Sequence, residues 1–230
     1  MFENENQLEL QQEEERTCQR CRELGEKMHV VFVVNIVILI LTVLLVATSA
    51  SVIANPYGGS LGLAAFLLLL SAIGIIVCSI VYCVSVFQMG KYYDAFKTAG
   101  VLMLVAVILG ALGNMTSGGL ASLLSIASNI VKIFQLKYFI DGATDALIPT
   151  NTDVTSRWES LWKVYLITLV ATLISSVGAY IPVINILAGI VAIICAIVSI
   201  IVGIWELILI KATSDALIYR SYGTESGQTE

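Results

Sequence analysis

The sequence predicts an all-α integral membrane protein, in which six transmembrane helices form three tandem helical hairpins with both termini in the cytoplasm. Composition, the lengths of the apolar runs and the placement of basic residues support this prediction. Of 230 residues, 58% are hydrophobic and 13% are charged, whereas soluble domains carry about 25% charged residues. Low charge combined with long apolar blocks is typical of a protein embedded in a bilayer.

Six apolar runs follow one another along the chain. They cover residues 30–54, 61–88, 99–113, 120–139, 161–180 and 183–210. A helix needs roughly 20 residues to cross a hydrocarbon core of about 30 Å. The third run is shorter, so we expect its helix to begin earlier, near residues 91–96. Ser156 and Glu159 match a capping box, which predicts a helix start just before the fifth run.

A short pattern occurs three times and divides the spans into pairs. The pattern is an aliphatic residue, an aromatic residue, Gln or Glu, and then Leu or Met. It occurs at residues 86–89, 133–136 and 204–207. Asp-Ala and an aromatic or aliphatic residue then follow at 94–96, 145–147 and 215–217. We interpret the first pattern as the end of each second helix, in hairpins covering about 28–96, 97–148 and 157–218.

The basic residues predict the orientation of the spans. All 12 Lys and Arg lie within residues 16–27, 91–97, 132–163 and 211–220, and the turns at 55–60, 114–119 and 180–183 carry no charge. The positive-inside rule then places both termini in the cytoplasm. An alternative with five spans, in which residues 99–139 form one bent unit, would put one basic terminus outside. We expect a prokaryotic cytoplasmic (inner) membrane, with the lipid bilayer as the main partner.

Two polar tails flank the predicted transmembrane domain of residues 28–218. Residues 1–27 form an acidic cytoplasmic tail, and residues 219–230 form a polar C-terminal tail. Cys18 and Cys21 make a CxxC, but no second pair completes a four-ligand zinc site. We expect two reduced thiols and no metal or cofactor; zinc shared across an oligomer and lipidation are the alternatives. The net charge of −5 argues against a nucleic-acid partner.

Polar residues at membrane depth are candidate functional residues. The predicted intramembrane polar layer consists of Asn129, Lys132, Gln135 and Glu206. Lys132 and Glu206 are expected at similar depths, so we expect them to meet directly or through Gln135. The alternative is that each side chain reaches water at the headgroups separately.

Small residues recur along one face of the sixth span. They are Gly189, Ala192, Ala196, Ser199 and Gly203, with spacings of three and four. Such stripes let helices approach closely in membranes. The stripe predicts a packing seam within the chain, or a seam with a second copy or another membrane protein.

The sequence contains no catalytic or phosphate-binding motif, so we expect a protein that is not an enzyme. The apolar runs are unbroken, whereas helices interrupted near the midplane are typical of secondary transporters. A structural or accessory subunit of a membrane assembly is therefore the favoured function. A small oligomeric channel or transporter is the alternative.

Overall fold

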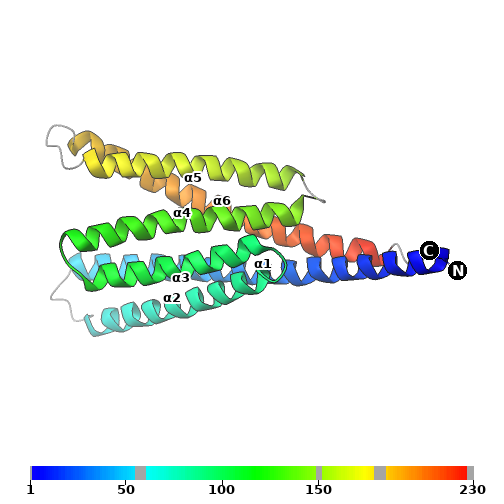
Figure 1. Cartoon of the computed structure of the whole chain (residues 1–230). Coiled ribbons are helices and arrows are strands. Elements are labelled where there is room, and N and C mark those ends of the chain that lie inside the picture. The colour runs from blue at the N-terminus through cyan, green and yellow to red at the C-terminus, as the bar shows by residue number, and fades with distance from the viewer. Residues whose placement is uncertain (1, 55–60, 149–151, 179–184, 227–230) are drawn as a thin grey trace.

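The computed structural model describes residues 2–54, 61–148, 152–178 and 185–226, and these ranges contain only helices and short turns. The helices are α1 (Phe2–Ala54), α2 (Leu61–Met89), α3 (Asp94–Met115), α4 (Gly119–Leu147), α5 (Thr152–Gly178) and α6 (Asn185–Ser226). They run in alternating directions, so α1 begins and α6 ends at the same end of the molecule (Figure 1). We call this the terminal end.

The outer surface of the helices is apolar. Five segments of the described chain are long and apolar enough to cross a membrane: Gln12–Ser49, Gly62–Met89, Asp94–Gly113, Gly119–Leu147 and Ile197–Tyr222. Large aliphatic side chains on their faces, such as Ile40, Leu63 and Ile200, are more than 60% exposed. Water would solvate such a continuous surface poorly. The prediction of an all-helical, multi-pass membrane protein is confirmed.

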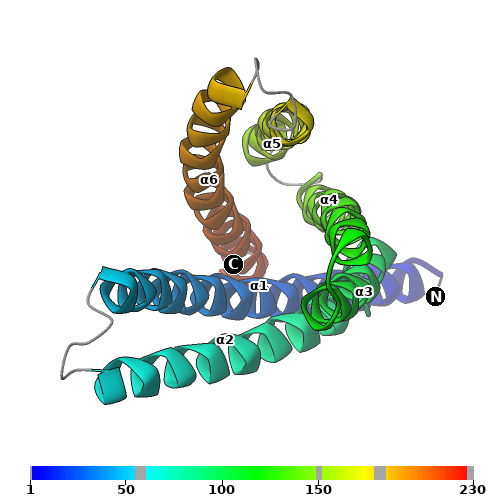
Figure 2. The same ribbon diagram turned by 90° about the vertical axis from the view of Figure 1, so that its left-hand side faces the viewer.

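The six helices are arranged as a ring. Each helix packs against the next one in the sequence, and α6 returns to pack along α1 (Figure 2). Short connections explain the sequential contacts. The contact between α6 and α1 depends on Gly25, because a Cβ at this position would lie 2.7 Å from Cγ1 of Ile218. The Ser214 hydroxyl donates to the Gly25 carbonyl over 2.8 Å and fixes this contact.

α3 and α4 are two separate helices that pack side by side. α3 begins at Asp94, within the predicted range of 91–96. Gly118 has a φ of 72°, a left-handed conformation that favours glycine and lets the chain reverse. The Ser128 hydroxyl on α4 then donates to the Ala106 carbonyl on α3 over 3.0 Å. The alternative of one bent unit across residues 99–139 is therefore wrong.

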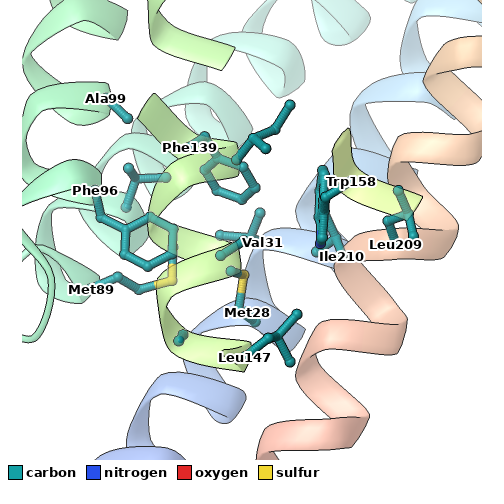
Figure 3. Packing of buried hydrophobic residues seen from close by; sticks show 14 of the residues in the cluster. Met28, Val31, Met89, Phe96, Ala99, Phe139, Leu147, Trp158, Leu209 and Ile210 are labelled. Carbon is teal, nitrogen blue, oxygen red and sulfur yellow. The ribbon is translucent and has the colours of Figure 1, made fainter. Parts of the chain in front are cut away.

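A hydrophobic core joins all six helices near the terminal end (Figure 3). Its fully buried members include Met28, Met89, Phe96, Phe139, Trp158 and Ile210. The ring of Phe139 lies edge-on to Phe96 at 5.5 Å and to Trp158 at 6.1 Å. Trp158 Nε1 donates to the Thr213 hydroxyl over 2.9 Å. Aromatic contacts and one buried hydrogen bond thus connect α3, α4, α5 and α6.

The interpretation of the repeated pattern is partly wrong. α2 does end at Met89, next to Gly90, but α4 continues to Leu147 and α6 to Ser226. The pattern therefore ends only one of the three second helices. What the repeats share is a buried position, because Phe96, Leu147 and Leu217 are each at most 1% exposed in the common core.

One helix boundary differs from the sequence prediction. α5 begins at Thr152, so Ser156 lies inside the helix, and its hydroxyl donates to the Asp153 carbonyl. The expected capping box is therefore wrong. α1 runs unbroken through residues 27 and 28, so the acidic tail and the first apolar run belong to one continuous helix.

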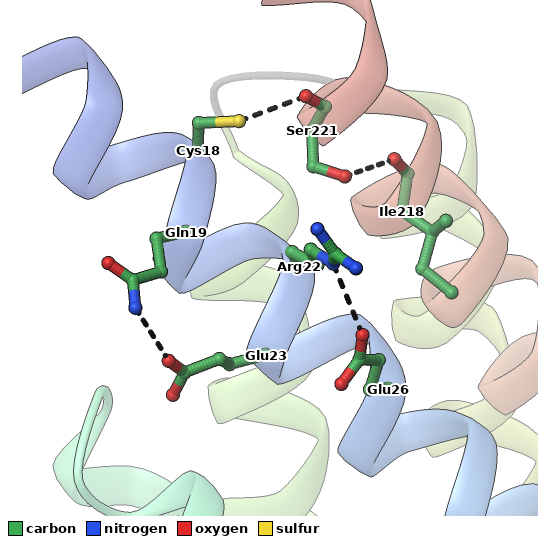
Figure 4. A network of polar contacts seen from close by, with 7 residues as sticks. All are labelled: Cys18, Gln19, Arg22, Glu23, Glu26, Ile218 and Ser221. Atoms are coloured by element: carbon green, nitrogen blue, oxygen red, sulfur yellow. Dashed lines mark hydrogen bonds and ion pairs between the residues drawn. The ribbon is translucent and has the colours of Figure 1, made fainter. Parts of the chain in front are cut away.

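The polar ends of α1 and α6 pack together at the terminal end (Figure 4). Cys18 Sγ donates to the Ser221 carbonyl over 2.9 Å. Arg22 pairs with Glu26 over 3.3 Å on α1, a spacing that supports a helix. Most of the expected C-terminal tail belongs to α6, which continues to Ser226, and residues 227–230 lie outside the described residues.

Candidate ligand site between the helices

Three of the four residues of the predicted polar layer line one cavity. This cavity has a volume of about 330 Å³ and lies between α4, α5 and α6. Asn129 and Lys132 reach it from α4, and Glu206 reaches it from α6. Gln135 lies elsewhere: it is within hydrogen-bonding reach of Tyr82 on α2. We call this space the α4–α6 cavity.

Most of the surface that lines the α4–α6 cavity is apolar. Ile126, Ile130, Ile133, Leu169 and Val202 line it, together with the hydroxyl residues Tyr165, Thr168, Thr172 and Ser199. Apolar walls with a few polar groups are typical of small-molecule sites, whose volumes are about 300–1,000 Å³. The α4–α6 cavity is at the lower end of this range, so its size fits a small ligand.

A second cavity lies between α1 and α6. It has a volume of about 280 Å³, and α1 supplies Asn35 and Thr42 to its wall. Ser199, Gly203 and Glu206 line both cavities. Their spacing of four and three residues places them on one face of α6. Glu206 therefore stands where the two cavities approach each other.

The small stripe on α6 contributes to these cavities. A Cβ added at Gly203 would meet no atom within 4 Å, so no neighbouring helix packs onto this glycine. Ser199 is exposed, and its hydroxyl donates to the Cys195 carbonyl over 2.8 Å. The side chains of Gly189, Ala192 and Ala196 lie outside what the structure describes.

Lys132 and Glu206 do not form an ion pair. Among the described residues, ion pairs join Arg22 with Glu26, Lys137 with Asp141, and Arg157 with Asp153, and none joins Lys132 with Glu206. Lys132 is exposed, whereas Glu206 is half-buried and interacts electrostatically with the phenols of Tyr82 and Tyr165. The expected direct contact is therefore absent, although both side chains line the α4–α6 cavity.

The sequence analysis missed the polar face of α5. Tyr165, Thr168 and Thr172 line the α4–α6 cavity. Their spacing of three and four residues is a helical stripe that the sequence already displays. Such a stripe is a weak signal of a site, since threonine hydroxyls commonly bond within their own helix. Thr168 indeed donates to the Val164 carbonyl, and Thr172 to the Thr168 carbonyl, each over 2.8 Å.

The CxxC of α1 has no metal-binding surroundings in the described chain. Cys21 is buried and Cys18 is half-buried, and no cluster of three or more His, Cys, Asp or Glu occurs among the described residues. Nearby, the Tyr92 hydroxyl donates to the Glu23 carboxylate. This hydrogen bond raises the pKa of Tyr92 to about 12, so the phenol remains a neutral donor at physiological pH.

Comparisons with protein-family models, with curated proteins and with solved structures found no match to this chain.

Proposed function

We propose that this chain is a non-enzymatic carrier or channel that binds a small polar solute inside a membrane. The observation that carries the proposal is Glu206, a carboxylate at membrane depth that lines two cavities. Placing a charge at this depth costs on the order of 3 kcal/mol. Since no ion pair within the described residues offsets this cost, a solute is the partner that would stabilise the charge.

The proposal includes six spans, with both termini in the cytoplasm of a prokaryotic cell. One-sided placement of the 12 basic residues supports this orientation. The start of α1 and the end of α6 lie at the same end of the molecule, which supports an even number of spans. α5 is the span that this proposal adds to the five apolar segments described above. Its 27 residues cover about 40 Å at ~1.5 Å per residue. Three of its polar side chains face the α4–α6 cavity instead of lipid.

Transport through reconstituted membranes tests the proposal. Proteoliposomes are incubated with a mixture of small cations, anions, zwitterions and neutral solutes, and their contents are measured by mass spectrometry. Gly203→Leu fills the cavities from an open position. Ile201→Leu is the control, because it places a leucine on a different face of α6, where the side chain is 58% exposed. We expect at least one solute to enter with wild-type protein and Ile201→Leu, and not with Gly203→Leu. Entry no greater than in protein-free liposomes, or equal entry with Gly203→Leu, contradicts the proposal.

A structural or accessory subunit is the second candidate. The observation that favours it is the start of α1, where Glu13, Glu14 and Glu15 are exposed. An exposed acidic helix offers a binding surface to a basic partner. Affinity purification from membranes distinguishes the candidates: a stoichiometric protein partner, lost when the three glutamates are changed to Gln, supports the subunit. Solute entry that depends on Gly203 supports the carrier or channel.

A further inference from the structure

We infer that the α4–α6 cavity binds a small zwitterion with an apolar side group, whose ammonium lies at Glu206 and whose anionic group lies at Lys132. The inference rests on the proposed function and names its solute class. One acid and one base line this cavity, and neither takes part in an ion pair of the described residues. A solute carrying both charges neutralises the two side chains together.

The opposite signs of the two charged side chains favour a zwitterion over a singly charged ligand. Lys132 and Glu206 reach the cavity from α4 and α6, with a volume of about 330 Å³ open beside them. A cation would bind at Glu206 but would be repelled by Lys132, and an anion would meet the reverse problem. Because unpaired charges at membrane depth are costly, a ligand that leaves one charge unpaired binds less tightly.

The neighbours of each charge match one end of the zwitterion. Tyr165 lines the cavity and interacts with Glu206, and a carboxylate beside an aromatic ring suits an ammonium group. Asn129 lines the cavity one turn from Lys132, and its amide can donate to a carboxylate. The aliphatic wall, which includes Ile130 and Val202, accommodates the apolar side group.

Binding measurements with three matched probes test the inference. The full chain is purified in detergent, and titration calorimetry is performed with L-leucine, with isopentylamine, which lacks the carboxylate, and with 4-methylpentanoate, which lacks the ammonium. A panel of neutral amino acids from glycine to phenylalanine is measured in parallel. We expect at least one amino acid to bind, and each single-charge analogue to bind about tenfold more weakly or not at all, because it loses one charged hydrogen bond.

Charge-removing variants locate the two ends of the zwitterion. Glu206→Gln and Lys132→Met should each weaken amino-acid binding about tenfold or more. Glu159→Gln and Lys211→Met are the matched controls, since both residues are exposed and line neither cavity. These controls should bind like wild type. Should a cavity variant fail to fold, the three probes on wild-type protein still decide the question.

Several results would overturn the inference. Isopentylamine binding as tightly as leucine indicates a cation site, and equally tight binding of 4-methylpentanoate indicates an anion site. Failure of every amino acid in the panel to bind also refutes it. Each of these outcomes leaves the proposed function intact if a solute still enters proteoliposomes in a Gly203-dependent manner. Absence of such entry refutes the proposed function itself.

Discussion

Replacing Gly142 with Ala should destabilise the core, although Ala is normally the better helix former. A Cβ at Gly142 would lie 3.0 Å from three ring atoms of Phe96. This ring cannot move away easily, because it is fully buried and packs against the rings of Tyr93 and Phe139. The distances between the ring centroids are 6.4 and 5.5 Å. Overpacking costs typically 1–3 kcal/mol, and the gain in helix propensity is about 1 kcal/mol. We therefore expect a net loss of about 1 kcal/mol.

Gly203→Ala is the matched control for this prediction. Gly203 also lies inside a helix, but its added Cβ would meet no atom within 4 Å. Only the propensity gain of up to about 1 kcal/mol then applies, so the two variants should differ by about 2 kcal/mol. Reversible unfolding in mixed detergent micelles measures this difference. Equal stability of the two variants would refute the packing argument.

A second change identifies the cause of the strain. Phe96→Leu removes the ring atoms that a Cβ at Gly142 would touch. Gly142→Ala should therefore cost less in the Phe96→Leu background than in wild type. A double-mutant cycle should show a coupling of about 0.5 kcal/mol or more, as expected for residues in contact. Strict additivity would place the strain elsewhere.

Three further predictions concern the core, the topology and the cavity. Trp158→Phe removes the donor to a buried hydroxyl on α6 and should cost about 1–3 kcal/mol of unfolding free energy, measured in the same micelles. A single Cys at Ser117 should react with an impermeant maleimide on intact cells, whereas one at Ser226 should react only after lysis, because the positive-inside rule places Ser226 in the cytoplasm. Lys132→Met and Glu206→Gln should have additive effects on the unliganded protein, within about 0.5 kcal/mol, because the two charges are not paired.

Each of these predictions has a contradicting result. Trp162→Phe is the control for Trp158→Phe, because it alters a partly buried ring of α5. If both variants lose the same unfolding free energy, the hydrogen bond of Trp158 is unimportant. Labelling at Ser226 from outside would overturn the six-span topology. A stability coupling well above 0.5 kcal/mol between Lys132 and Glu206 would mean that the charges meet without ligand.

The class of the protein follows from the sequence because it depends on local properties. Long apolar runs predict membrane-spanning helices, and the described chain contains five helices that are long and apolar enough to cross a membrane. The turn after Met115 was also predictable, since its glycines provide the backbone freedom that a reversal needs. The stripe at Tyr165 and Thr168 could have been identified by the same helical periodicity.

The ends of α4 and α6 were decided by the tertiary structure. The pattern at residues 133–136 looks like a helix end, yet α4 continues because Phe139, Ala143 and Leu147 are buried in the common core. The free energy gained by burying these side chains stabilises the helix through polar residues such as Asp141 and Asp145. Local sequence could not predict this result, since the burying partners belong to other helices.

The cavity likewise depends on contacts between distant parts of the chain. Asn129, Tyr165 and Glu206 lie on three different helices, and only the closure of α6 onto α1 and α5 brings them to one space. A small residue such as Gly203 permits either close packing or an open cavity. Which of the two forms depends on whether a neighbouring helix approaches the glycine. No atom lies within 4 Å of a Cβ added at Gly203, so a cavity forms here. The sequence thus determined which residues are polar at membrane depth, and the packing of the ring determined that three of them share one cavity.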